Sequence, residues 1–200
     1  ENNLFTPGEL ISMSVCLNHR GPDANDYYYT DTVGLCNTRL SILDLSPQAN
    51  QPMHSHSNRY VIVYNGEVYN FKEIAAELNL NFRTNCDTEV IVEAFSEWGV
   101  TFVKRLNGMF AIAIYDKQED ILYLFRDRMG VKPLYYFWDG KNFAFASELK
   151  ALMKLDYINN RKQVFKRSIN EFLYLGYIPG PHTIYQNIYK FPAGHFYFYR

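Results

Sequence analysis

Four short runs of β-branched and aromatic residues follow one another between residues 109 and 147, and they restrict the fold more than any other feature of the chain. The runs are Met109 to Tyr115, Ile121 to Arg126, Leu134 to Trp138 and Asn142 to Ser147. Each is too short for a typical helix, and the connections between them are short. Asp139-Gly140 is typical of a tight hairpin turn. We therefore predict antiparallel sheet in this region.

Helical signals lie on either side of these runs. Three segments have the spacing of a capping box, which favours a helix start: Thr6 to Glu9, Asn70 to Glu73 and Ser168 to Glu171. Further helices are predicted around Ile91 to Trp98 and Glu148 to Leu155, and further strands at Val33 to Leu45, Tyr60 to Tyr64 and Gly194 to Arg200. This order predicts an α+β fold in which sheets pack between helices.

The composition excludes several classes of protein. Lys and Arg total 20 against 21 Asp and Glu, so the net charge of −1 gives no field that would gather nucleic acid or anionic lipid. The apolar runs are far shorter than the ~20 residues of a membrane-spanning helix. Three cysteines cannot form a closed disulfide framework, and they suit a reducing compartment. We therefore expect a cytoplasmic protein that binds neither nucleic acid nor membranes.

An Asn-Gly pair, Asn65-Gly66, is the sharpest local signal for chemistry. Its flanking β runs favour a tight hairpin turn on local pattern alone. The functional alternative is an oxyanion hole, in which a side-chain amide and a backbone N–H donate to one developing negative oxygen. Both interpretations stay open at this stage.

Two charged residues extend the functional alternative. Arg39 lies in an apolar run, where it is either an outward-facing strand residue or a bidentate ligand for a carboxylate. Asp87 precedes a helix, where it is either a helix-end carboxylate or an acceptor for an ammonium group. With Asn65-Gly66 these residues would hold an amino acid whose side chain carries a reactive carbonyl. A nucleophile is missing from this set.

Other candidate residues favour structural roles. Cys16, Cys36 and Cys86 have no histidine at a catalytic spacing, and we predict that they are unpaired and structural. His54-Ser55-His56 lacks the companions of a zinc site and indicates a surface loop. Arg126-Asp127-Arg128 indicates a solvated or structural charge cluster.

Longer motifs carry a resemblance to a known family. They are His19-Arg20-Gly21-Pro22-Asp23, Arg39 to Ser46, Gln51-Pro52-Met53, Tyr64-Asn65-Gly66-Glu67-Val68-Tyr69-Asn70, Cys86-Asp87-Thr88-Glu89-Val90, Leu106 to Ala111, Arg126 to Tyr136 and Phe145 to Ala151. In this order they resemble the glutaminase domain of asparagine synthetase (glutamine-hydrolysing). The similarity covers nearly all of residues 15–151, and residues 177–195 resemble the approach to the synthetase domain that follows in that family.

The resemblance implies a four-layer αββα sandwich of the N-terminal-nucleophile hydrolase type, with the start of a second domain at the C-terminus. Residues 1–155 would form the glutamine amidotransferase domain without its first strand and leading cysteine, and residues 156–200 a linker and the start of the synthetase domain. Asn65 and Gly66 would be catalytic, binding the oxyanion. Arg39 would bind the glutamine carboxylate, and Glu67 and Asp87 the glutamine amino group. Asn37 stands where many relatives have histidine.

The resemblance also implies a function for the longer polypeptide. Glutamine would be hydrolysed to glutamate and ammonia, which a synthetase domain of the same polypeptide would use to amidate aspartate. ATP and Mg²⁺ are expected in that domain, no cofactor or metal is expected in these 200 residues, and a homodimer is one possible assembly. Without the leading cysteine, these residues alone are expected to be inactive. The alternatives are transfer of ammonia to another carboxylate, such as a sugar acid, or a silent scaffold that lost its cysteine.

Overall fold

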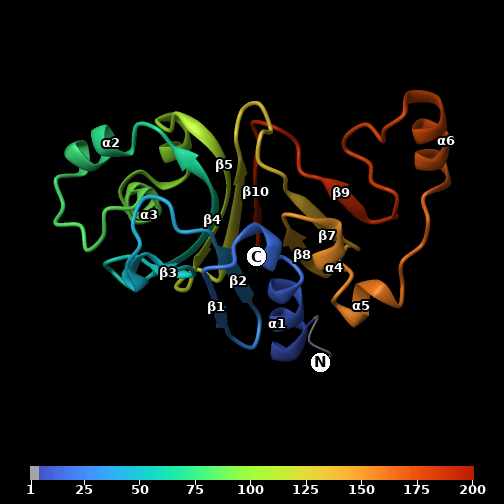
Figure 1. The fold of residues 1–200 in the computed structure, drawn as a ribbon, viewed down its shortest axis with the longest axis horizontal. Helices are drawn as coiled ribbons and strands as arrows, with labels where there is room; N and C mark the ends of the chain where they lie inside the picture. The colour runs from blue at the N-terminus through green and yellow to red at the C-terminus, as the bar shows by residue number, and fades with distance from the viewer. Residues whose placement is uncertain (1–4) are drawn as a thin grey trace.

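The computed structural model describes residues 5–200, in which helices combine with antiparallel strands (Figure 1). The helices are α1 (Pro7–Val15), α2 (Phe71–Leu78), α3 (Asp87–Trp98), α4 (Leu149–Leu152), α5 (Asp156–Asn159) and α6 (Lys166–Leu175). The strands are β1 (Ala24–Tyr29), β2 (Gly34–Arg39), β3 (Met53–His54), β4 (Tyr60–Val68), β5 (Gly108–Asp116), β6 (Ile121–Arg126), β7 (Tyr135–Trp138), β8 (Phe143–Ala146), β9 (Ile188–Lys190) and β10 (Phe196–Tyr199). Within residues 5–200 no helix has the length and hydrophobicity needed to cross a membrane.

The larger sheet has the strand order β10-β6-β5-β4-β3 and separates two hydrophobic cores. Successive strand residues point to opposite faces, so Ile62 and Phe125 lie in the core covered by α2 and α3. Val63 and Leu124 point to the other face and lie in a second core. The alternation of the predicted runs therefore produces a sheet that is buried on both faces.

A second sheet layer packs on that other face. It consists of β1-β2 and of β8-β7-β9, and Leu35 of β2 shares the second core with Tyr136 of β7. Helices α1, α4 and α5 cover the outside of this layer, where Met13, Phe137 and Leu152 form part of a third core. The sequence of layers is helices, sheet, sheet, helices. The prediction of an α+β sandwich of the αββα type is confirmed.

The three predicted capping boxes have different outcomes. At α1 the box is present, because Glu9 N donates to Thr6 Oγ1 at 3.2 Å and Thr6 N donates to Glu9 Oε2 at 2.7 Å. Helix α2 begins after Asn70 as predicted, but the prediction of a capping box there is wrong, because the Asn70 side chain does not cap the helix. The Asn70 amide instead donates to Arg105 O at 2.9 Å and accepts from Asn107 N at 2.9 Å, which ties the helix start to a loop.

Helix α6 begins earlier than predicted, so the capping box from Ser168 to Glu171 is wrong. The N-cap residue is Phe165, and Ser168 lies buried inside the helix. Phe165 N donates to Ile184 O at 2.9 Å, next to a bridge between Val164 and Tyr185. This contact with a distant segment fixes the helix start, and local sequence does not reveal it.

Two strand boundaries also differ from the prediction. Strand β2 ends at Arg39, because the Arg39 guanidinium donates to the carbonyl oxygens of Asp44 and Ser46 and holds the following residues in a loop. Strand β4 does not end at Tyr64. It continues through Asn65 and Gly66, which lie opposite Ala111 and Phe110 of β5.

The interpretation of Asn65-Gly66 as a hairpin turn is therefore wrong. The pair lies inside a strand, and Gly66 is suited to its place by its small size. A Cβ atom on Gly66 would lie 2.3 Å from Met109 O and 2.8 Å from Phe110 Cα. Glycine at this position lets β4 and β5 approach closely.

Strands that follow the predicted boundary at residue 155 pair with strands that precede it. β10 pairs with β6, placing Phe196 opposite Phe125, and β9 pairs with β7. Both sheet layers therefore include chain from residues 156–200. Helix α6 lies apart, at one end of the molecule (Figure 1).

Candidate active site

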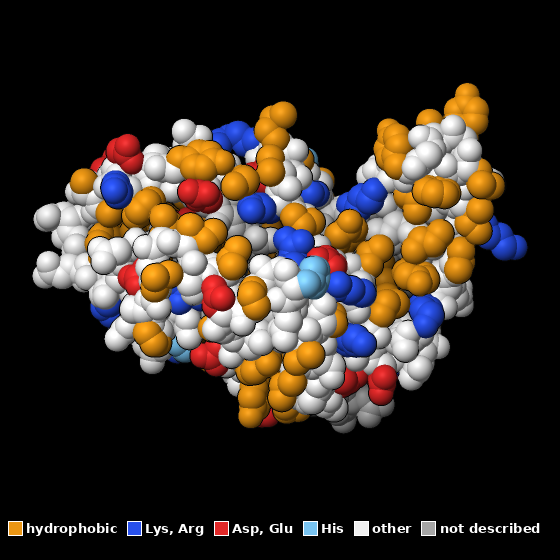
Figure 2. All heavy atoms as spheres, in the orientation of Figure 1, with side chains coloured by type: hydrophobic (Ala, Val, Ile, Leu, Met, Phe, Trp, Pro, Cys, Tyr) orange, Lys and Arg blue, Asp and Glu red, His pale blue; other side chains and the backbone are white. Residues whose placement is uncertain are grey.

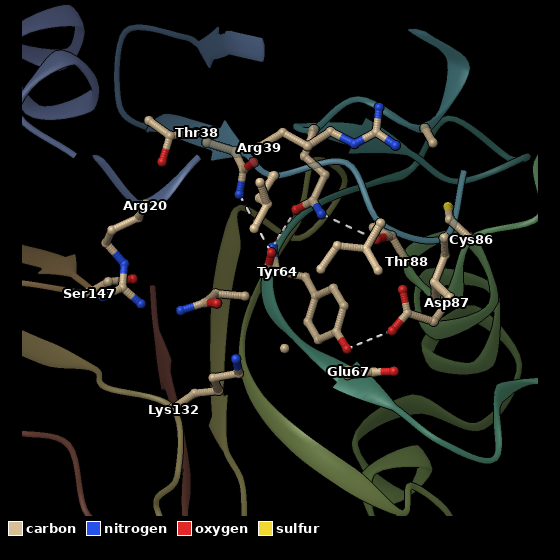
Figure 3. Close-up of a pocket in the computed structure, with 18 of the residues that line it drawn as sticks. Arg20, Thr38, Arg39, Tyr64, Glu67, Cys86, Asp87, Thr88, Lys132 and Ser147 are labelled. Carbon is tan, nitrogen blue, oxygen red and sulfur yellow. Dashed lines mark hydrogen bonds between the residues drawn. The ribbon is translucent and has the colours of Figure 1, made fainter. Parts of the chain in front are cut away.

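A cavity of about 520 Å³ opens where β2, β4 and the start of α3 meet. All five residues that the sequence singled out line it: Arg39, Asn65, Gly66, Glu67 and Asp87. Strand β2 ends in Arg39, strand β4 supplies the next three, and Asp87 is the first residue of α3. Figure 3 shows Asp87 and Glu67 on one side of the cavity, with Arg20, Ser147 and Lys132 on the other.

The Asn65 amide is an unpaired donor. Its Nδ2 atom is buried and has no hydrogen-bond partner among the described residues. A buried polar group without a partner costs about 1–3 kcal/mol. An acceptor atom of a ligand would remove that cost, so the amide is suited to bind an oxygen in the cavity.

Hydrogen bonds from β4 hold the buried carboxylate of Asp87. Its Oδ2 accepts from the Tyr64 hydroxyl at 2.7 Å and from Val68 N at 3.1 Å. Burial raises the pKa of Asp87, and the nearby Glu67 charge adds to the effect, while these hydrogen bonds oppose it. A ligand cation would favour the ionised form, which makes this side of the cavity suited to an ammonium group.

Sequence reasoning did not single out Gln51 or Tyr64. Buried Gln51 accepts from Tyr64 N at 2.6 Å and donates to Thr88 Oγ1 at 3.2 Å, bridging β4 and α3 in the cavity wall. Asn37 Nδ2 donates to Tyr64 O at 3.5 Å. Gln51 and Tyr64 both belong to the quoted motifs, but an uncharged amide and a tyrosine give no separate signal for a site.

The Arg39 guanidinium lies at the rim of the cavity. Besides the Asp44 and Ser46 carbonyls, it donates to Asn50 Oδ1 at 2.8 Å. These bonds shape the loop after β2, and they engage Nη1 with two acceptors and Nη2 with one. Its binding of a substrate carboxylate stays a prediction.

The cluster Arg126-Asp127-Arg128 is structural, as the sequence indicated. Asp127 is buried and accepts from the backbone N–H groups of Phe110, Met129, Val131 and Lys132. Burial opposes ionisation, but these bonds lower the pKa of Asp127. The buried carboxylate thereby fixes the backbone that carries Lys132 to the cavity wall.

The three cysteines are free, as predicted. Cys36 lines the cavity, but burial raises the pKa of its thiol to about 12, which keeps it protonated near neutral pH. Burial also raises the pKa of Cys16. Cys86 is buried at the N-cap of α3, with its Sγ atom 3.0 Å from Thr84 Oγ1. Neither Cys16 nor Cys36 is suited to be a nucleophile, and Cys86 lies beside Asp87 rather than Asn65.

The interpretation of His54-Ser55-His56 as a surface loop is confirmed only for His56, which lies in an exposed turn after β3. His54 belongs to β3 and Ser55 is buried. His56 Nε2 lies 2.7 Å from Oε1 of the fully buried Glu89. The segment packs against α3, a contact between distant residues. Among residues 5–200, no group of three or more His, Cys, Asp or Glu side chains is arranged to hold a metal ion.

Two further hollows continue the cavity along β2 and β8. The first, about 80 Å³, is bordered by Cys36 and Asn37 on one side and by residues 145–147 on the other. The second, about 360 Å³, is bordered by residues 31–36 and 142–145. β2 pairs with β1, and β8 with β7, so each keeps one unpaired edge. We call this feature the β2–β8 groove.

The β2–β8 groove has the form of a place for one more strand. Its floor includes Val63 and Ala113 of the larger sheet, and Met13 of α1 and Ala151 of α4 lie on its other side. Residue numbers rise along both borders in the same direction, so a strand antiparallel to β2 and β8 would pair with both. Its end at the cavity would lie close to Asn65.

Comparisons with known proteins agree with this geometry. A model of the glutamine amidotransferase domain family matches residues 3–200. Asparagine synthetase [glutamine-hydrolyzing] 2 of Bacillus subtilis is 38% identical over 192 residues, covering 94% of this chain and 25% of that protein. Asparagine synthetase B [glutamine-hydrolyzing] of Escherichia coli is 38% identical over 148 residues, covering 72% and 26%. The chain therefore spans about a quarter of the length of these relatives.

A solved structure shares the fold. It is the glutamine phosphoribosylpyrophosphate amidotransferase from B. subtilis complexed with ADP and GMP. The TM-score is 0.52 at 21% sequence identity, over 61% of this chain and 29% of that one. At this identity the similarity concerns the fold alone.

Proposed function

This chain belongs to the glutamine amidotransferase domain family, and from that premise we propose that its cavity binds glutamine and is the glutaminase site of a longer, asparagine-synthetase-type polypeptide. The single observation that carries this proposal is the buried Nδ2 of Asn65, which has no hydrogen-bond partner within residues 5–200 and lies in the same cavity as Asp87 and Glu67. The Asn65 amide can donate to an oxygen atom of a ligand, and the carboxylates of Asp87 and Glu67 can bind a cation. Glutamine carries both an amide oxygen and an ammonium group.

In the proposed binding mode, the two charged ends of glutamine have different partners. Glu67 and Asp87 hold the α-ammonium group, and Arg39 at the rim holds the α-carboxylate. The side-chain amide then lies beside Asn65 and Gly66 of β4. These contacts orient the reacting carbonyl and change little during the reaction.

We propose that the nucleophile is a leading cysteine on a segment that fills the β2–β8 groove as an extra strand. The thiol gives its proton to the cysteine's own α-amine, whose reference pKa is about 7.7–8.0, and the sulfur attacks the amide carbon. Asn65 Nδ2 and Gly66 N–H stabilise the negative oxygen that forms. As this intermediate collapses, the departing amide nitrogen takes the proton from the cysteine's α-ammonium group and leaves as ammonia, and water then hydrolyses the remaining thioester to glutamate and the free thiol.

We propose that the ammonia is used by a synthetase domain of the same polypeptide, which amidates aspartate with ATP and Mg²⁺ in the cytoplasm. We assign ATP and Mg²⁺ to that domain because the sequence of this chain has no phosphate-loop motif, and among residues 5–200 no group of three or more His, Cys, Asp or Glu side chains is arranged to hold a metal ion. The named relatives do not favour transfer to another carboxylate, such as a sugar acid, which is therefore only an outcome of the test.

The test uses the complete polypeptide with a free leading cysteine. We expect ammonia and glutamate to appear in equal amounts from glutamine, and replacement of the leading cysteine by serine to stop the reaction without changing the thermal unfolding temperature. Purified protein that is folded but releases no ammonia would instead support a silent scaffold. Adding aspartate or sugar acids with ATP then identifies the acceptor.

A further inference from the structure

Tyr64 connects the two halves of the cavity and has no part in the chemistry above. It precedes Asn65 on β4, is only 6% exposed, and reaches across to α3 with its hydroxyl (Figure 3). Its backbone N–H is fixed by Gln51 Oε1 at 2.6 Å, and its hydroxyl donates to Asp87 Oδ2 at 2.7 Å. Hydrogen bonds therefore fix both the backbone and the hydroxyl group of Tyr64.

The hydrogen bonds to Asp87 from β4 are asymmetric. The Tyr64 hydroxyl and the Val68 N–H both donate to Oδ2. A carboxylate held by two donors on one oxygen cannot rotate freely, so Oδ1 has a fixed direction. An oxygen with a fixed direction binds an ammonium group at lower entropic cost than a mobile one.

We propose that Tyr64 is a positioning residue that acts through Asp87 to select substrates with an α-ammonium group. This inference rests on the proposed function, because it assigns the ammonium of glutamine to Asp87. Tyr64 would contribute to binding of glutamine and not to stabilisation of the transition state. The strand that carries the oxyanion donor Asn65 would thus also set the geometry of the ammonium site.

The test compares two ligands that differ only in the amino group. In the complete polypeptide, Tyr64→Phe should raise KM for glutamine about 10-fold, the lower range for a hydrogen bond to a charged group, and change kcat less than about 2-fold. The inhibition constant of 4-carbamoylbutanoate, which is glutamine without the α-amine, should stay unchanged. A purely structural role of the hydroxyl would weaken both ligands equally.

Tyr60→Phe is the matched control. Tyr60 is a buried residue of the same strand, and no described residue hydrogen-bonds to its hydroxyl. We expect this variant to bind both ligands like the wild type. Equal weakening of both ligands in Tyr64→Phe, or its failure to fold, would overturn the positioning role alone. A folded wild type that neither hydrolyses nor binds glutamine would overturn the proposed function and this inference with it.

Discussion

Asn65 illustrates how far a single residue could be interpreted from sequence. The Asn-Gly pair singled out from the sequence lines the cavity, but its local pattern favours a turn, because such pairs have the backbone freedom that hairpins require. The structure places the pair inside β4, where Gly66 is needed for close approach to β5. Pairing with a strand more than 40 residues away in sequence decided the outcome, and local propensity does not contain that information.

We predict that Asn65→Ala lowers kcat of the complete polypeptide about 10²–10³-fold and changes KM for glutamine little. The reason is that the amide acts on a charge that exists only in the transition state. Steady-state kinetics of glutamine hydrolysis measure both constants. A change in KM alone would show that Asn65 binds substrate without stabilising the oxyanion.

Arg39→Ala provides the contrasting variant. Arg39 would bind the carboxylate of glutamine equally in ground and transition states, so we expect a higher KM with kcat nearly unchanged. Arg39→Lys should recover part of the loss, because it keeps the charge but not the bidentate geometry. A fall in kcat without a rise in KM would contradict this assignment.

For helices and strands, sequence patterns predict that an element exists better than they predict where it begins and ends. The runs of residues 109–147 became β5, β6, β7 and β8 with ends shifted by one residue at most, since their alternation and turns are local signals. Strand β1 was missed, because its polar start resembles a loop. The capping boxes predicted for α2 and α6 are wrong, because Asn70 and Phe165 form hydrogen bonds with distant segments.

Gly66→Ala tests why β4 and β5 can pair. The added Cβ would meet backbone atoms of β5 at 2.3 Å and 2.8 Å, and backbone cannot rotate away. We expect the free energy of unfolding to fall by about 1–3 kcal/mol, the range for overpacking. Gly8→Ala is the control, since Gly8 lies in α1 with its nearest atom 3.9 Å away and alanine favours the helix. Urea denaturation of both variants measures the difference, and equal stability would contradict the argument.

Glu89 holds α3 to the segment before it and makes the stability of this region pH-dependent. It is fully buried and accepts from Thr84, Arg83 and His56. Burial opposes ionisation, but these bonds lower the pKa of Glu89 to about 2 from its ordinary 4.5. Because the folded-state pKa is the lower one, the stabilisation is present above about pH 4.5 and is lost as the pH falls toward 2.

We therefore expect Glu89→Gln to lower the unfolding temperature at pH 7 and to weaken its decline between pH 4.5 and 2. Glu97→Gln, an exposed residue of the same helix, should leave both unchanged. Thermal unfolding followed by circular dichroism across this range makes the comparison. If Glu89→Gln kept the pH dependence of the wild type, other carboxylates would account for it.

For the whole molecule, the resemblance of the motifs predicted the layers and the grouping of five residues around one cavity. The four layers and the common cavity of Arg39, Asn65, Gly66, Glu67 and Asp87 agree with it. The order of helical and β signals alone predicted only the α+β class. The β2–β8 groove could not be anticipated from residue patterns, because it is formed by edges of strands about 100 residues apart in sequence.

The surface also shows a hydrophobic region at one end of the molecule. Figure 2 shows orange side chains gathered on the projecting part that Figure 1 identifies as α6. Phe172, Leu173 and Tyr174 of this helix are exposed. Large exposed patches of this kind mark interaction sites. The helix follows the predicted boundary at residue 155.

In the proposed mechanism, this cavity becomes a glutaminase site when a cysteine reaches it from the β2–β8 groove. The most direct measurement is covalent trapping of the complete polypeptide with 6-diazo-5-oxo-L-norleucine, an alkylating analogue of glutamine, followed by peptide mass spectrometry. We expect one adduct, on the leading cysteine of the segment that fills the groove, with excess glutamine protecting it. An adduct on Cys36 or Cys86, or no adduct on folded protein, would contradict the claim.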